Sequence, residues 1–148
     1  MCLRMRRLGW QIWRIDAGMT LHDANMSRFG QFWNRMRRSG YAWAEGAAMY
    51  GRGPERYGVA GVRRALMWGL VLPLVILAGL VLIGSAGFWL LLAYPAQVIR
   101  LALRGGGSRG AWEQALFGTL GKFAETAGVV EYLMRRWRGQ TARIIEYK

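Results

Sequence analysis

The sequence predicts a mainly α-helical membrane protein, in which a transmembrane helical hairpin lies between cytoplasmic amphipathic helices. The 148 residues include 19 Arg and 2 Lys against 8 acidic residues, a formal charge of +13, yet 53% of them are hydrophobic. Residues 1–64 carry a net +8 and residues 100–148 a net +5, whereas residues 65–99 contain no charged side chain and no histidine. A small water-soluble globule interleaves charged and apolar positions, so this segregation argues against that class and against a disordered basic tail.

The uncharged segment predicts a hairpin over residues 65–103. As one helix, its 35 uncharged residues would extend about 52 Å, which exceeds the ~30 Å hydrocarbon core of a bilayer. The sequence Gly-Ser-Ala-Gly at 84–87 offers a break, so we expect helices at 65–83 and 88–103. The alternative interpretation is one tilted span followed by a re-entrant or interfacial segment at 88–103.

Arginines flank this segment on both sides. Arg63 and Arg64 precede it, Arg100, Arg104 and Arg109 follow it, and the turn between the helices is uncharged. By the positive-inside rule both termini are expected in the cytoplasm, and the Arg-rich, Lys-poor composition points to a bacterial inner membrane. Arginines near the surface attract anionic membrane lipid by about 1 kcal/mol each. Because the arginines follow the membrane topology, we expect no nucleic-acid partner.

The N-terminal 25 residues predict the end of a larger domain. Residues 2–8 are expected to form a short helix that ends at Gly9, a favourable left-handed capping position. Residues 10–15, WQIWRI, are aromatic and β-branched and predict a strand. One helix and one strand cannot bury a core, so residues 1–25 are interpreted as a remnant whose packing partners lie elsewhere. The segment has no uninterrupted apolar core, so no signal peptide is expected.

Residues 26–50 predict an interfacial amphipathic helix with Ser27 as its N-cap. Arginines dominate one face, an arrangement typical of a helix that lies in the membrane interface. A helix packed on a soluble domain fits the same pattern. Four glycines and a proline within residues 51–64 predict a loop. The apolar residues of the helix recur at spacings of three and four, at Phe29, Trp33, Met36, Gly40, Trp43, Ala47 and Tyr50.

A second long amphipathic helix is expected after the hairpin. Residues 104–110 are rich in glycine and predict a linker, and residues 111–148 predict a cytoplasmic helix and tail. Basic residues precede Gly139, where we expect the helix to end, and they suit the negative end of the helix dipole. The predicted apolar stripe consists of Trp112, Leu116, Leu120, Phe123, Ala127, Val130, Met134 and Trp137.

Few residues offer catalytic chemistry. Cys2 is the only cysteine and His22 the only histidine, and the sequence contains no phosphate-binding loop or metal-binding motif. His22 and Asp23 form either a turn that caps the following helix or a catalytic or ligand pair. The arginines within residues 28–38 form either a solvated or lipid-facing basic surface or a clamp for an anionic group such as a diphosphate.

The run CLRMRRLGWQIWRIDAGMTLHDANMSRFGQFWNRMRRSGYAWAEG resembles the last part of the catalytic domain of membrane-bound family-2 glycosyltransferases. In that family a helix of the form E-L-C-x-R-L-R-x-x-G-W is followed by a strand, an M-T-x-H-D segment, and an interfacial helix rich in Arg and aromatic residues. The run GKFAETAGVVEYLMRRWRGQTARIIEYK is similar to the C-terminal ending of these enzymes. The matching N-terminal residues are Cys2, Arg4, Arg6, Gly9, Trp10, Met19, Thr20, His22 and Asp23.

The resemblance implies that residues 1–25 end a GT-A catalytic domain of α/β fold. The nucleotide-sugar pocket, the Asp-x-Asp metal site and the acidic base would lie upstream, so a divalent cation, Mg²⁺ or Mn²⁺, is expected for the complete enzyme and none in this chain. Family members position donor diphosphate and acceptor with a Gln-x-x-Arg-Trp element, but Gln31 is here followed by Phe-Trp-Asn-Arg. No catalytic residue is assigned, and the residues implied for substrate or diphosphate positioning are His22, Asp23, Gln31, Arg35, Arg38, Tyr41 and Trp43.

The leading hypothesis is the membrane-anchored C-terminal portion of a glycosyltransferase. Such an enzyme moves a sugar from a nucleotide-sugar donor to a lipid or polysaccharide acceptor. Because the donor and metal sites would belong to the catalytic domain, we expect the isolated chain to be inactive. The alternative hypothesis is a small non-enzymatic inner-membrane adaptor that binds anionic lipid and a partner protein.

Overall fold

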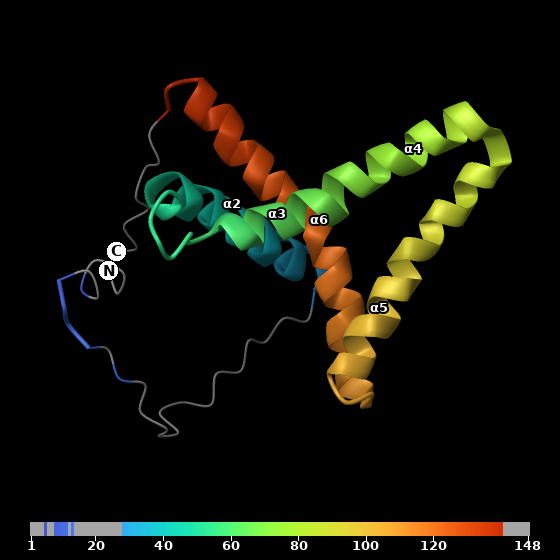
Figure 1. The fold of residues 1–148 in the computed structure, drawn as a ribbon, viewed down its shortest axis with the longest axis horizontal. Helices are drawn as coiled ribbons and strands as arrows, with labels where there is room; N and C mark the ends of the chain where they lie inside the picture. Colours follow the sequence, from blue (N-terminus) through green and yellow to red (C-terminus); the bar gives the residue numbers. More distant parts are fainter. Residues whose placement is uncertain (1–4, 6–7, 12, 14–27, 141–148) are drawn as a thin grey trace.

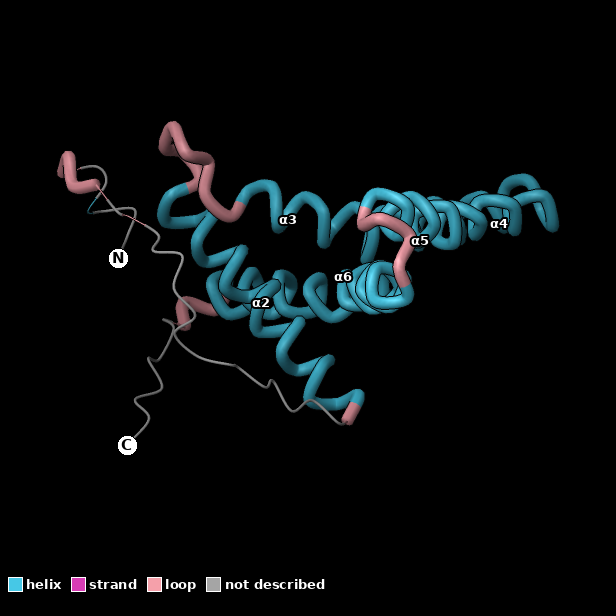
Figure 2. The backbone as a smooth tube through the Cα atoms, turned by 90° about the horizontal axis from the view of Figure 1, so that it is seen from below, coloured by secondary structure: helices cyan, strands magenta, loops and turns pink. Residues whose placement is uncertain are grey.

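The computed structural model describes Met5, residues 8–11, Trp13 and residues 28–140, and no strand occurs in these residues. Helices α2, α3 and α6 pack together and are called the base (Figure 1). Two apolar arms project from one side of the base: η1 with α4, and η2 with α5 (Figure 2). The elements are α2 (Phe29–Tyr50), α3 (Val59–Leu66), the π-helical turn η1 (Met67–Val71), α4 (Leu72–Ile83), the 3-10 helix η2 (Gly84–Leu92), α5 (Ala93–Arg104) and α6 (Arg109–Trp137).

Only part of the predicted N-terminal helix and strand lies within the described residues. Gly9 has a φ of 83°, and the amide of Trp10 donates to the carbonyl of Met5 at 3.1 Å, which is the left-handed helix end that the sequence predicts. The described residues of the strand predicted at 10–15 are not in a strand, so that prediction is wrong for them. A strand must pair its backbone with a neighbouring strand, and the described part of the chain contains none.

The predicted helix at 26–50 is present as α2, and its apolar stripe packs within the molecule. Met36 lies against Gly121 of α6, and the indole of Trp43 lies against α3, where a Cβ at Gly61 would come within 2.8 Å of the ring. These contacts favour the packed-helix interpretation of the stripe over the interfacial one. Ser27 lies outside the described residues.

The loop predicted at 51–64 is wrong in its second half, because α3 begins at Val59. Gly58 adopts a φ of 78°, a conformation that glycine reaches without strain, and places the start of α3 against α2. The glycine content predicted a loop, but Gly61 serves instead as the contact point on Trp43. Tertiary packing has therefore overridden local helix propensity in this segment.

α2 crosses α6 with the two backbones in contact. A Cβ at Gly40 would meet the carbonyl of Glu125, and a Cβ at Gly128 would meet the carbonyl of Arg37. Small residues at a crossing let helix axes approach closely, because no side chain stands between them. The hydrophobic core of the base is correspondingly made of small residues, Ala44, Ala65 and Val129.

The packing face of α6 is not the predicted one. Four members of the predicted stripe, Trp112, Leu116, Leu120 and Phe123, line an open apolar groove toward α5, and the first three of them remain 41%, 47% and 40% exposed. The prediction assumed that the large apolar side chains of the helix are the ones that pack. Two helices whose backbones are in contact can place only small side chains between them. The residues that α6 buries are mostly small: Ala111, Ala115, Thr119, Gly121, Ala124, Glu125, Thr126, Gly128 and Val129.

The linker before α6 is shorter than the predicted 104–110. α5 ends at Arg104 and α6 begins at Arg109, because the hydroxyl of Ser108 accepts a hydrogen bond from the amide of Ala111 at 3.2 Å and caps the helix. At the other end α6 stops at Trp137, and Gly139 has a φ of 68°, in agreement with the predicted helix end.

The apolar arms run back along each other. The chain reverses at Gly84, whose φ of 64° and ψ of −141° suit glycine, and α4 packs against η2. The break falls within the predicted residues 84–87 and α4 ends at the predicted residue 83, but the following residues form the 3-10 helix η2, so α5 starts at Ala93 rather than at the predicted residue 88. Among the described residues one helical stretch, Val59–Arg104, is long and apolar enough to cross a membrane.

Candidate functional site

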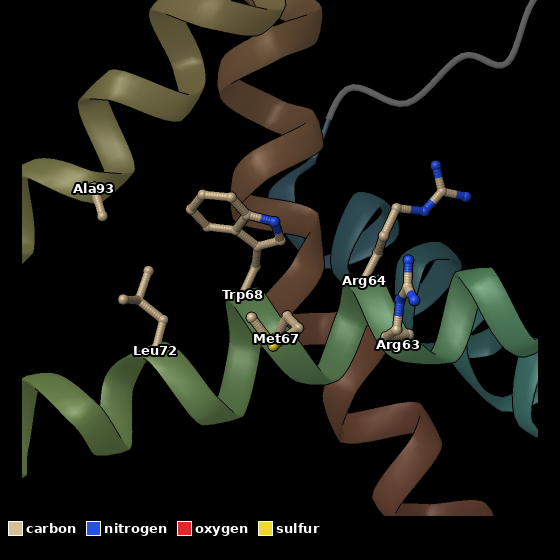
Figure 3. A pocket seen from close by; sticks show the side chains of 6 residues that line it. All are labelled: Arg63, Arg64, Met67, Trp68, Leu72 and Ala93. Carbon is tan, nitrogen blue, oxygen red and sulfur yellow. The ribbon is translucent and has the colours of Figure 1, made fainter.

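An open groove of about 540 Å³ lies where the apolar arms leave the base. Figure 3 shows Arg64, Trp68 and Leu72 extending to the same side of the continuous helical run, with Ala93 facing them from α5. The groove therefore joins a cationic end on α3 to an apolar end between the two arms. Its lining residues are Arg63, Arg64, Met67, Trp68, Leu72 and Ala93.

The cationic end consists of Arg63 and Arg64 in the last turn of α3. Both side chains are exposed, and the Nε of Arg64 donates to the carbonyl of Ala60 at 3.2 Å, which orients its guanidinium. Within the part of the chain that the structure describes, neither guanidinium forms a salt bridge with a carboxylate. Two adjacent guanidinium groups of this kind suit a phosphate or carboxylate ligand.

The apolar end is fixed by a chain of aromatic rings. The ring of Trp68 lies 6.1 Å from that of Tyr94, and Tyr94 lies 5.6 Å from Phe123 of α6. The hydroxyl of Tyr94 donates to the carbonyl of Trp68 at 2.8 Å. These contacts connect both arms to α6 at the floor of the groove.

The π-helical turn η1 lies directly under the groove. It precedes Pro73, which has no N–H and whose ring excludes a carbonyl four residues earlier, so the α-helical bonding pattern is interrupted there. Gly69 in this turn touches α6, where a Cβ would come within 2.6 Å of the carbonyl of Lys122. The hydroxyl of Thr126 donates to the carbonyl of Ala65 at 2.7 Å. This hydrogen bond and the close approach at Gly69 hold the first arm against α6.

Replacement of Thr126 by valine is expected to lower the free energy of unfolding by about 1 kcal/mol, because the buried Ala65 carbonyl loses this donor. Thr119→Val is the matched control. Thr119 is equally buried on the same helix, but its hydroxyl donates to Ala115 within that helix. Thermal melts of the detergent-solubilised chain, followed by near-UV circular dichroism, compare the two variants. If both variants lost the same amount of stability, the Thr126 hydrogen bond would not hold the arm on α6.

Among the described residues, the structure brings together only three of those implied for substrate positioning. His22 and Asp23 lie outside the described residues. Gln31, Arg35 and Arg38 share one exposed face of α2, since at about 100° per residue they fall within about 60° of each other. The side-chain oxygen of Gln31 accepts a hydrogen bond from the amide of Arg28 at 3.3 Å and caps the helix. Trp43 lies on a different face of α2, against Gly61 of α3.

Tyr41 lines a second groove, of about 330 Å³, near the C-terminal end of α6. Its ring meets Tyr132 edge-on at 5.3 Å, and the guanidinium of Arg135 lies 5.9 Å from the ring centre. Arg135 also forms a salt bridge with Glu131 at 2.8 Å. Through these contacts Tyr41 and Arg135 hold α2 against α6. The two side chains therefore do not form a free clamp for an anion.

No three His, Cys, Asp or Glu side chains lie together within the described residues. This part of the chain therefore does not fit a Mg²⁺ or Mn²⁺ site. Comparison with protein-family models, curated proteins and solved structures found no match to this chain.

The sequence contained a signal for the groove that the prediction did not use. Arg63 and Arg64 were interpreted only as topology markers, although Arg64, Trp68 and Leu72 follow each other at four-residue spacing along one helix face. Ala93 completes the groove from the second arm, 25 residues beyond Trp68. No local pattern relates two residues so far apart, so the groove itself depends on tertiary structure.

Proposed function

We propose that the chain is the membrane-anchoring C-terminal portion of a family-2-type glycosyltransferase, with its apolar arms inserted as a transmembrane hairpin in the bacterial inner membrane. The observation that carries the anchoring role is the exposure of the arms. Only 6% of the most apolar 18-residue segment of Val59–Arg104 is buried. Leu74, Leu82 and Trp89 are 54%, 81% and 75% exposed. A continuous apolar surface of this kind favours contact with lipid rather than with water.

The positions of the arm ends support a common cytoplasmic side for both flanks. α3 and α5 both pack on α6, so the arginines of α3 and of α5 lie at the base end of the arms, whereas the connection from α4 to η2 lies at their far end (Figures 1 and 2). The first arm, Met67–Ile83, would extend about 26 Å as a helix, close to the ~30 Å thickness of the hydrocarbon core. The base would then rest against anionic lipid headgroups, to which its basic flanks are attracted.

The transferase role is supported by the resemblance of residues 2–46 and of the C-terminal run to family-2 enzymes. In this role the exposed face of α2 that carries Gln31, Arg35 and Arg38 lies nearest to His22 and Asp23 along the chain, and we assign it to the donor diphosphate. The nucleotide-sugar and the lipid or glycan acceptor would bind through the catalytic domain. Sugar transfer from UDP or GDP donors by the purified chain alone would contradict this proposal.

Reporter fusions test the hairpin directly. Alkaline phosphatase fused after Gly87 is expected to be active, because that residue would lie outside the membrane, whereas green fluorescent protein fused after Lys148 is expected to fluoresce in the cytoplasm. A fusion after Arg64 is the control and should behave like the one at Lys148. A cytoplasmic signal at all three positions would refute the two-span hairpin, whereas phosphatase activity at both Gly87 and Lys148 would favour one span followed by a re-entrant or interfacial segment.

The second candidate function is the non-enzymatic adaptor, and the partly exposed apolar stripe of α6 favours it. Its residues Trp112, Leu116, Leu120 and Phe123 line an open apolar groove of about 490 Å³ between α6 and α5, and the first three remain 40–47% exposed. The DNA upstream of the Met1 codon separates the two candidates. An in-frame sequence that encodes Asp-x-Asp and Glu-Asp elements supports the transferase, whereas a promoter and ribosome-binding site supports the adaptor.

A further inference from the structure

We infer that the groove between α3 and the apolar arms binds one anionic phospholipid, with its phosphate on Arg63 and Arg64 and an acyl chain against Leu72 and Ala93. This inference rests on the proposed insertion of the arms in a membrane. The groove would be a specific site for one class of ligand, whereas the proposed function requires only a general attraction of the basic flanks to anionic lipid.

The charge pattern of the groove selects an amphiphile rather than a soluble anion. Arg63 and Arg64 are exposed at one end, and the described residues bring no carboxylate within salt-bridge distance of them. From Met67 onward the lining is apolar over about one and a half helical turns, to Leu72 and Ala93. A soluble phosphate would use the first part of the groove and leave the second part exposed to water, at an unfavourable hydrophobic free energy.

The position of the groove along the arms matches the depth of a lipid headgroup. The arginines are the last charged residues before the uncharged segment 65–99, and Trp68 follows them by one turn. Tryptophan prefers the level of the headgroups, because its ring is apolar and its N–H is polar. A phosphate at the level of the arginines therefore places its acyl chain beside Leu72, which lies about two turns deeper than the arginines.

The site is rigid, because the structure holds its floor from two directions. Trp68 is tied to Tyr94 of the second arm by the 2.8 Å hydrogen bond, and Ala65 is tied to Thr126 of α6 at 2.7 Å. Ala93 and Leu72 face each other across the groove from the two arms. A preorganised groove loses little freedom on binding, so it retains a lipid for longer than a flexible basic surface does.

Lipid retention by the full chain tests the inference. The chain is reconstituted in nanodiscs of phosphatidylcholine with a minority of phosphatidylglycerol, released into detergent, and examined by native mass spectrometry for bound phosphatidylglycerol. The unmodified chain is expected to retain one molecule. Arg63→Gln with Arg64→Gln should reduce the retained fraction roughly thirtyfold, from about 1 kcal/mol per arginine. The control Arg52→Gln with Arg56→Gln removes two exposed arginines of the same flank that do not line the groove, and it should change retention by less than about threefold.

A second variant keeps the test independent of net charge. Leu72→Trp leaves both arginines in place but fills the apolar end, and it is expected to reduce retention about as strongly as the double Gln variant. Equal losses for both arginine pairs, or no loss for Leu72→Trp, would overturn the inference in favour of delocalised attraction. Displacement of the lipid by soluble glycerol phosphate would overturn it in favour of a free phosphate site. Alkaline carbonate extraction separates the two proposals: an extractable chain refutes the membrane anchor, whereas an inserted chain without retained lipid refutes only this site.

Discussion

Replacement of Gly128 by alanine is expected to destabilise the base by about 1–3 kcal/mol, although alanine is the better helix former. The added Cβ would meet the carbonyl of Arg37 and lie 2.8 Å from the amide nitrogen of Tyr41, both backbone atoms of α2. Backbone atoms cannot rotate away, so the two helices must separate. The expected result is a lower midpoint in thermal melts of the solubilised chain, followed by near-UV circular dichroism.

Gly118→Ala is the matched control for this prediction. Gly118 lies on the same helix, but a Cβ there would have no atom within 4 Å. Removing an exposed helical glycine is expected to stabilise the chain by about 0.5–1 kcal/mol, so the two alanine substitutions should have opposite signs. If both variants were stabilised, α2 and α6 could not be in backbone contact at Gly128.

Replacement of Leu74 by arginine is expected to prevent stable membrane insertion. Leu74 lies near the middle of the first arm with 54% of its surface exposed, so an arginine there would face lipid. The cost of an arginine at the centre of a spanning helix is about 2.5–3.5 kcal/mol on insertion scales, which shifts the insertion equilibrium on the order of a hundredfold. The measurement is the fraction of the chain that resists alkaline carbonate extraction.

Leu133→Arg is the control for the membrane experiment. Leu133 is 52% exposed and belongs to α6 of the base, where a long arginine side chain can reach the headgroups or water. This variant should stay in the membrane fraction. A loss of both variants from that fraction would mean that the base is as deeply embedded as the arms, and retention of both would refute insertion of the arms.

The sequence allowed the helical elements to be predicted better than their contacts. The charge-free segment, the helix of residues 29–50 and the end of α6 before Gly139 follow local patterns, and the structure contains all three. The buried face of α6 was predicted wrongly, because large apolar residues such as Trp112 were expected to pack. Packing at backbone distance excludes large side chains, and a hydrophobic pattern contains no information on helix separation.

The candidate site was predictable only in its parts. Arg63 and Arg64 were identified as topology markers, and both line the groove. Their combination with Ala93 depends on the reversal at Gly84 and on the hydrogen bond from Tyr94 to Trp68. Conversely, Tyr41 and Trp43 were selected by resemblance, and their contacts assign them to packing within the base.

The position of α6 at the end of the helical order determines when the base can assemble during synthesis. α6 packs against α2, α3, η1 and α5, and yet it is translated after all of them. If the arms insert as proposed, the first arm would therefore reach the bilayer before α6 emerges from the ribosome. Chains fold from the N-terminus as they emerge, so under this proposal insertion of the first arm would precede assembly of the base. The first arm would then take its orientation from its apolar length and from the arginines that precede it, and α6 would pack against α2, α3 and α5 afterwards.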